Sequence, residues 1–281
     1  MRLALLSDVH ANHPAFARAV ALSERAGAEG FVLMGDYVCD FAHPRKTFDL
    51  VAELRRRYPT WLIRGNRDEY LLDHRAGKSP DWRDGTAGGS LLYTYENLRE
   101  EDFALLESLP SCLEVRMDGH PPFAVCHGSP FRAREMMIED DGRIGECLKV
   151  VSTDRLFLGH THRVRRFRAD GKEAHFCGSI GLPDGFGGMT QFALLDDRTG
   201  AWEIEHVMAE YDVEAAVAEI EASGLAARAG LWARAVAVMA RTGKNAPDLL
   251  VRTARELAGG WKGPIPESCF VEAARRIGIL P

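Results

Sequence analysis

The chain has 281 residues, of which 46% are hydrophobic and 27% charged, a composition typical of a folded globular protein. Its formal net charge of −6 argues against the broad basic field that attracts nucleic acid or anionic membranes. No apolar run reaches the roughly 20 residues needed to span a bilayer, and no signal peptide is recognisable. We therefore expect a cytoplasmic protein without membrane attachment and without a strong nucleic-acid signal.

The six cysteines are scattered along the chain and include no C-x-x-C pair. In a protein of this size without an export signal, we expect them to be reduced thiols that mostly fill the core. A thiolate metal site is not expected.

Five short apolar runs each stop abruptly at a polar residue. They are too short for helices and too uniformly apolar for half-exposed strands, so we interpret them as buried strands of a sheet covered on both faces. The runs are 3–6, 31–34, 61–63, 123–126 and 156–158.

Helical patterns lie between the early runs. Residues 14–27 place Phe16, Ala19 and Val20 on one face and end at a glycine, a common helix stop signal. Residues 44–58 repeat this periodicity. The strand–helix–strand alternation predicts an α/β sandwich.

The pattern changes near the C-terminus. Residues 191–195 and 202–207 resemble the two arms of a β-hairpin, and the chain becomes alanine-rich and helical from about Tyr211 onward. We therefore divide the chain into a catalytic domain, 1–208, and a helical appendage, 209–281.

The appendage carries more apolar side chains than a solvated tail could leave uncovered. It could pack on its own core domain beside the active-site cleft, or pair with a second chain, so a monomer and a homodimer both stay open. We favour packing on the core, because Pro264 and Pro266 near Trp261 indicate a turn that folds the last helix back.

Carboxylate, imidazole or amide side chains follow each of the five apolar runs. Each alone has an ordinary explanation, such as a turn cap or a hydrogen-bonded core histidine. Together, at the strand ends where α/β folds form their sites, they indicate a metal centre. The candidate ligands are Asp8, His10, Asp36, Asn66, His127, His160 and His162.

These donors contain no cysteine and suit manganese, iron or zinc. Seven ligands exceed what one ion needs, whereas two ions that share Asp36 account for all of them. Two metals about 3.5–4 Å apart are a common arrangement for phosphoryl chemistry.

The ordered motifs resemble those of the calcineurin-like metallophosphoesterases, in particular the small stand-alone phosphodiesterases of bacteria and archaea. The resemblance covers roughly residues 1–207. The motifs are Asp8-x-His10, Gly35-Asp36, Gly65-Asn66-x-Asp68, His127-Gly128 and Gly159-His160-Thr161-His162.

This resemblance implies a four-layer α/β/β/α sandwich, followed here by the helical appendage. It implies that Asp8, His10 and His162 hold a first divalent metal, that Asn66, His127 and His160 hold a second, and that Asp36 bridges them. Manganese is the first choice, with iron, zinc, nickel and magnesium as alternatives. A hydroxide between the ions would attack phosphorus in line.

One position departs from the family pattern. In many members the residue after the motif asparagine is a histidine that protonates the leaving group, steadied by an aspartate, whereas here Arg67 precedes Asp68. Arginine cannot donate a proton at a relevant pH, but it can clamp phosphate. Alternatively, Arg67 pairs with Asp68 or another surface acid. His13 and His43 are substitute proton donors.

We therefore expect a phosphoesterase that hydrolyses a small phosphorylated or nucleotide substrate at phosphoester, phosphodiester or anhydride bonds. The alternative is a non-catalytic metal-binding interaction scaffold of the same fold, which would have no reason to keep every ligand. Specificity is expected from the loops 37–44 and 73–89 and from the appendage. The candidate catalytic residues are Asp36, Asn66, Arg67, Asp68 and His127.

Overall fold

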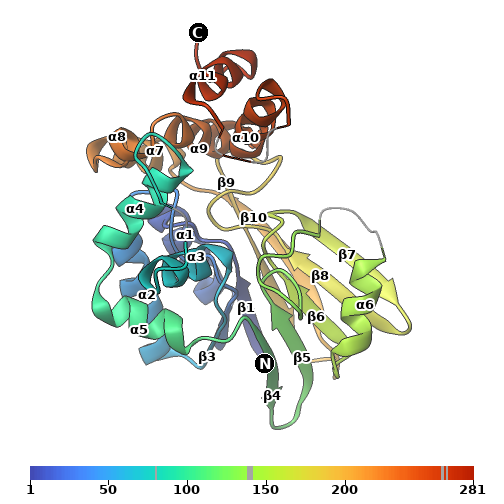
Figure 1. Cartoon of the computed structure of the whole chain (residues 1–281). Coiled ribbons are helices and arrows are strands. Elements are labelled where there is room, and N and C mark those ends of the chain that lie inside the picture. Colours follow the sequence, from blue (N-terminus) through green and yellow to red (C-terminus); the bar gives the residue numbers. More distant parts are fainter. Residues whose placement is uncertain (80, 138–141, 261–262, 264) are drawn as a thin grey trace.

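Two five-stranded sheets form the centre of the computed structural model, which describes residues 1–79, 81–137, 142–260, 263 and 265–281 (Figure 1). The first sheet has the strand order β10-β9-β1-β2-β3 and the second has the order β4-β5-β6-β8-β7. The strands are β1 Arg2–Leu6, β2 Gly30–Leu33, β3 Thr60–Leu62, β4 Cys112–Met117, β5 His120–Cys126, β6 Arg155–Leu158, β7 Val164–Ala169, β8 Lys172–Cys177, β9 Met189–Asp196 and β10 Glu203–Glu210.

All five predicted core strands are present, as β1, β2, β3, β5 and β6. The expectation that they end in one sheet is wrong, because β1, β2 and β3 are parallel neighbours in the first sheet while β5 and β6 are parallel neighbours in the second. An apolar run shows that a strand is buried but not which strand it pairs with. The two sheets agree with the α/β/β/α sandwich that the family resemblance implied.

Alternate side chains of β1 explain why its sequence is apolar throughout. Leu3 and Leu5 join the cluster between the two sheets, together with Phe123 and Phe157 of the second sheet. Ala4 and Leu6 point to the other face and join the cluster beneath the helices. A strand covered on both faces has no position for a polar residue.

Helices cover the outer faces of both sheets. Helices α1 (His13–Arg25) and α2 (Pro44–Arg57) match the two predicted ones and pack on the first sheet. Helix α6 (Arg143–Val150) packs on the second sheet. The remaining helices before residue 200 are α3 Asn66–Arg75, α4 Ala87–Asn97 and α5 Glu100–Ser108.

The C-terminal helices lie together at one end of the sandwich, shown in orange to red in Figure 1. Apolar residues of the first three form one cluster with Phe41 and Leu182, so they pack on the rest of the chain as we favoured. The turn predicted around Trp261 and Pro264 lies outside the described residues. The helices are α7 Val213–Ala222, α8 Leu225–Ala229, α9 Leu231–Thr242, α10 Ala246–Leu257 and α11 Glu267–Arg276.

Two cysteines differ from the prediction. Cys112 on β4 and Cys126 on β5 lie directly opposite each other in register, with Cα atoms 4.2 Å apart, and form a disulfide. The expectation that all six cysteines are free thiols is therefore wrong for this pair, because scattered sequence positions do not reveal cross-strand register. Among the described residues, no helix is long and apolar enough to cross a membrane.

Candidate metal centre

All seven predicted ligands follow strand ends, and the structure brings them together where the two sheets meet. Six of them form two groups, and the potential ligand atoms within each group lie within 4.8 Å of one another. The seventh, Asn66, begins α3 and faces the second group. The groups are Asp8, His10 and His162, and Asp36, His127 and His160.

The backbone around these residues adopts an unusual conformation. Nine described non-glycine residues have positive φ, and six of these belong to the site. The left-handed conformation costs such residues about 1–3 kcal/mol each, and it persists only where the surrounding structure enforces it. Backbone strain is therefore concentrated at this site. The six are Asp8, His10, Asp36, Asp40, His160 and His162.

Gly65 shows how closely the chain segments approach one another. A Cβ atom at this position would lie 2.2 Å from Asp36 Oδ1 and 2.4 Å from the Asp36 backbone nitrogen. Any larger residue would therefore displace the carboxylate. This contact explains the glycine before Asn66 in physical terms.

In the first group, two histidines turn their Nε2 atoms toward each other at 3.1 Å. His10 directs Nδ1 to Asp40 Oδ2 at 3.0 Å, and His162 directs Nδ1 to the Leu182 carbonyl at 2.8 Å. Because both of these partners accept hydrogen bonds, Nδ1 of each ring carries a proton, and the neutral form of each ring has its lone pair on Nε2. Asp8 Oδ1 lies 3.3 Å from His162 Nε2. These acceptors need a proton or a metal cation between them.

The second group has the same arrangement. His127 donates through Nδ1 to the Met34 carbonyl at 2.8 Å, so its Nε2 is left 3.4 Å from Asp36 Oδ1 and 3.0 Å from Asn66 Oδ1. One end of the Asn66 amide is directed at Asp36, His127 and His160; its NH2 group would donate hydrogen bonds to them, whereas its oxygen would face acceptors only. An oxygen in this position suits a metal ligand.

Asp36 lies between the two groups. Its Oδ1 faces His127, and its Oδ2 lies 3.8 Å from His10 Nε2. One carboxylate therefore reaches both sets of donors. This position is compatible with the bridging role that the resemblance implied.

The two buried carboxylates attract positive charge. Burial raises the pKa of Asp8, but His162 and His127 outweigh it and hold that pKa well below its usual range. Burial lowers the pKa of His127, but Asp36 and Asp8 raise it to about 10. Burial and the nearby His127 lower the pKa of His160 to about 3. The site thus favours a cation in its centre.

The alternative pairing of Arg67 with Asp68 is wrong. Asp68 is fully buried and accepts hydrogen bonds from the backbone N–H groups of Gly65 at 2.7 Å and Asp36 at 2.9 Å, so it supports the turn that carries the site. Arg67 instead lies 3.4 Å from Asp40 Oδ2, another buried acid. The other partner expected from the sequence, a surface acid, is also wrong, because Asp40 is only 2% exposed.

Asp40 and Trp232 are functional candidates that sequence analysis missed. The indole N–H of Trp232 in α9 donates to Asp40 Oδ1 at 2.7 Å, and the Arg67 guanidinium lies 5.6 Å from the centre of the indole ring. Neither residue follows a predicted strand, so no motif identified them. His10, Asp40, Arg67 and Trp232 form one connected network.

A cleft of about 530 Å³ is lined by five of the seven predicted ligands, namely His10, Asp36, Asn66, His160 and His162. Its described lining includes Asp40 of the 37–44 loop and side chains of α9 and α10, but no described residue of the predicted 73–89 loop, whose two ends belong to α3 and α4. His13 and His43 do not line it; His43 instead contacts Glu219 of α7 at 3.0 Å. The structure therefore does not place either substitute proton donor in the cleft.

Solved structures of other proteins share this fold. The structure of the hypothetical protein PH1004 from Pyrococcus horikoshii OT3 has a TM-score of 0.72 at 21% identity and covers 86% of this chain and 98% of its own. A metallophosphoesterase from Sphaerobacter thermophilus has a TM-score of 0.61 at 22% identity, with 80% of this chain and 95% of its own covered. Identities this low show the fold alone. A comparison with curated protein sequences gives no match.

The family is shown by sequence. The sequence model of the calcineurin-like phosphoesterase superfamily domain matches residues 1–200. This range is most of the chain and includes every predicted ligand. The chain therefore belongs to the calcineurin-like phosphoesterase superfamily.

Proposed function

We propose that this protein is a metal-dependent phosphoesterase that holds two divalent ions and hydrolyses a small phosphorylated or nucleotide substrate. The observation that carries the proposal is the pair of buried Asp–His groups, whose acceptor atoms converge although they come from two sheets. A scaffold would not need converging lone pairs, a shared carboxylate and an open cleft in one place.

The residues fit divalent metals. Asp8, His10 and His162 would hold one ion, and Asn66, His127 and His160 the other, with Asp36 shared between them. Nitrogen and oxygen donors without sulfur suit manganese first, and also iron, zinc, nickel or magnesium. When bound, such ions supply a more acidic water and neutralise charge on phosphoryl oxygens.

The chain's own groups would position the substrate. Arg67 is permanently charged, because Asp40 raises its pKa despite the opposing effect of burial, and it lines the cleft. We assign it the role of holding a phosphoryl oxygen. Asn66 would orient the same group, and Asp68 would hold the turn that carries Asn66. Residues 1–208 would form the catalytic domain, with 209–281 as an appendage that narrows the cleft.

The test removes the shared carboxylate. Asp36→Ala should lose bound manganese, measured by elemental analysis after dialysis, from about two ions per chain to fewer than one. Hydrolysis of bis(p-nitrophenyl) phosphate should fall at least about 100-fold, because even groups that only orient metal ligands cost 10–100-fold.

The matched control is Asp118→Ala, which removes an exposed aspartate from the turn between β4 and β5. It should keep both metal content and turnover. An Asp36→Ala protein with full turnover would rule out the two-metal proposal. Stoichiometric metal in wild-type protein without turnover of any phosphoester would favour the scaffold.

A further inference from the structure

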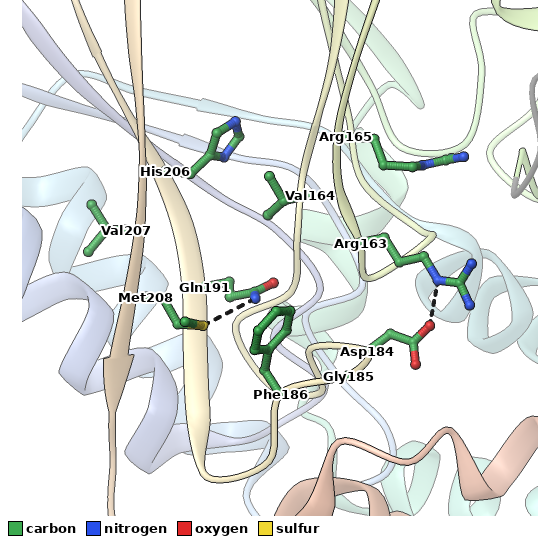
Figure 2. Close-up of a pocket in the computed structure, with 10 residues that line it drawn as sticks. All are labelled: Arg163, Val164, Arg165, Asp184, Gly185, Phe186, Gln191, His206, Val207 and Met208. Atoms are coloured by element: carbon green, nitrogen blue, oxygen red, sulfur yellow. Dashed lines mark hydrogen bonds and ion pairs between the residues drawn. The ribbon is translucent and has the colours of Figure 1, made fainter.

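A second hollow of about 650 Å³ lies beside the metal centre. Figure 2 shows its lining, where the side-chain amide of Gln191 contacts the Met208 sulfur and Phe186 is a further apolar member. Val164, Phe186 and Met208 are 39%, 46% and 46% exposed. They are half of the six large hydrophobic side chains that are exposed among the described residues, so apolar surface is concentrated in this hollow.

The hollow adjoins the cleft that five of the seven predicted ligands line. Arg163 and Asp184 line both spaces and form an ion pair, drawn in Figure 2. Arg163 directly follows His162, and the Asp184 backbone N–H donates to the His162 carbonyl at 3.0 Å. The Arg163–Asp184 ion pair is therefore shared by the walls of both spaces.

Several wall residues of the hollow come from strands at the edges of the two sheets, and Gln191 comes from the interior strand β9. Val164 lies on β7 and Met208 on β10, and these are the edge strands of the two different sheets. The hollow is thus the open gap between the sheet edges. Its position is set by the arrangement of the strands.

The floor of the hollow is anchored. The loop that carries Phe186 donates hydrogen bonds from the Gly185 and Gly188 N–H groups to the carbonyls of Gly243 at 2.8 Å and Ala240 at 2.7 Å. These bonds attach the loop to the C-terminal end of α9. Phe186 is therefore held half-exposed by a fixed backbone.

The chemistry of the lining indicates an aromatic occupant. An aromatic ring, a methionine sulfur and a valine favour a flat apolar group, and arginine favours aromatic faces. Asp184, the one carboxylate in this lining, is paired with Arg163, and burial lowers the pKa of His206. The hollow thus offers little attraction to a cationic group.

We propose that this hollow is a substrate subsite that holds an aromatic group of the phosphoester whose phosphoryl group binds at the metal centre. The inference rests on the proposed function and adds the substrate class to it. The aromatic group could be an aryl group or a nucleobase, and both present the same flat face.

The test compares phosphonates that are not hydrolysed and differ only in the attached group. Dissociation constants of methylphosphonate, benzylphosphonate and the phosphonate analogue of thymidine 5′-monophosphate, in which a CH2 group replaces the bridging 5′-oxygen, are measured by calorimetry on manganese-loaded protein. At least one aromatic ligand should bind at least about tenfold more tightly than methylphosphonate. A gain for benzylphosphonate would assign the site to aryl groups, and a gain for the nucleotide alone would assign it to a nucleobase.

Two variants locate that gain. In Phe186→Ala and in Met208→Asp, the ratio of the methylphosphonate and aromatic dissociation constants should fall at least about fivefold. The comparison uses a ratio because the added aspartate repels all three anionic ligands, so its effect on their dissociation constants largely cancels. Val150→Asp, at a 55% exposed site on α6, is the matched control and should keep the wild-type ratio.

The outcomes separate the two proposals. Methylphosphonate binding with no aromatic gain, or a gain that persists in both variants, would overturn the aromatic subsite alone. Absence of metal-dependent binding by all three ligands would overturn the proposed function and this inference with it.

Discussion

Asp40 connects the metal-ligand groups with the C-terminal helices. It is 2% exposed, and its carboxylate contacts His10, Arg67 and Trp232 at the same time. Burial raises the pKa of Asp40, but Arg67 and His10 outweigh it and hold that pKa well below its usual range. A carboxylate behind a metal-ligating histidine fixes the ring orientation and raises the basicity of the ligand nitrogen. We therefore expect Asp40 to position His10, and Trp232 to position Asp40.

The first residue-scale prediction concerns Trp232→Phe. This change removes the hydrogen bond to Asp40 but keeps an aromatic ring beside Arg67, so manganese affinity should fall about tenfold, as measured by calorimetry. Trp202→Phe is the matched control, because it also removes an indole hydrogen bond, the 2.7 Å bond to the Pro121 carbonyl, far from the site. Equal losses of affinity in both variants would contradict the role of Trp232.

The second residue-scale prediction concerns the leaving group. Arg67 is charged and paired with Asp40, so it cannot protonate a departing alkoxide. Aryl phosphodiesters should therefore be turned over at least about 100-fold faster than alkyl ones, since general-acid help is typically worth 10²–10⁴ in rate. A series with leaving-group pKa values from about 7 to 10 measures this dependence. A flat dependence would point to an unassigned acid, with Tyr70 in the cleft the first to replace.

At the scale of elements, the edge hairpin β7–β8 carries a concentrated charge cluster. Glu173 lies opposite Arg168 in register and accepts hydrogen bonds from Arg168 and Arg166 at 2.6 Å and from His175 at 3.0 Å. Burial raises the pKa of Glu173, but these partners lower it to about 2. Burial lowers the pKa of His175 to about 4 despite the opposing effect of Glu173.

Both shifts have the same consequence for stability. Each group has a lower pKa in the folded protein than in the unfolded chain. Its contribution to the free energy of unfolding is therefore complete above the pKa of the unfolded chain, and it is lost as the pH falls toward the pKa in the folded protein. His175 therefore weakens the fold as pH falls from 6.5 toward 4, and Glu173 does so from 4.5 toward 2.

The element-scale prediction is that Glu173→Gln lowers the free energy of unfolding at pH 7 by about 1 kcal/mol. This value is at the low end for charged hydrogen bonds, because the arginines are half-exposed or more. Urea unfolding should show the gap to wild type narrowing as pH falls below 4.5. Glu205→Gln, an exposed acid on β10, should show no gap at any pH. If the difference in unfolding free energy between Glu173→Gln and wild type did not change with pH, the predicted link between the pKa of Glu173 and stability would be wrong.

At the scale of the whole molecule, local patterns predicted local features well. The five core strands β1, β2, β3, β5 and β6, the helices α1 and α2 and the β9–β10 hairpin follow from periodicity and from the residues that end each run, whereas β4, β7 and β8 were not predicted. Three features could not be predicted from these local patterns. They are the pairing of strands into two sheets, the Cys112–Cys126 disulfide and the Asp40–Trp232 hydrogen bond. Each of these depends on distant segments, and Asp40 and Trp232 are 192 positions apart. Single-sequence patterns carry no signal for such contacts.

The last prediction tests whether the appendage belongs to the folded unit. Helices α7–α9 cover Phe41 and Leu182, which are 2% and 3% exposed. Re-exposing both would cost up to about 3–6 kcal/mol, a large share of the 5–15 kcal/mol that stabilises a typical domain. A chain ending at Glu210 should therefore be insoluble or melt far below wild type.

A chain ending at Gly243 keeps α7–α9 and serves as the graded control. It should stay folded, bind manganese and keep the Trp232 bond to Asp40, because only α10 and α11 are removed. The intact chain should elute as a monomer in gel filtration if its apolar helices are covered by its own core. A dimer that is lost on truncation would show instead that these helices pair with a second copy. A soluble and fully active chain ending at Glu210 would show that the appendage supports neither the core nor the cleft.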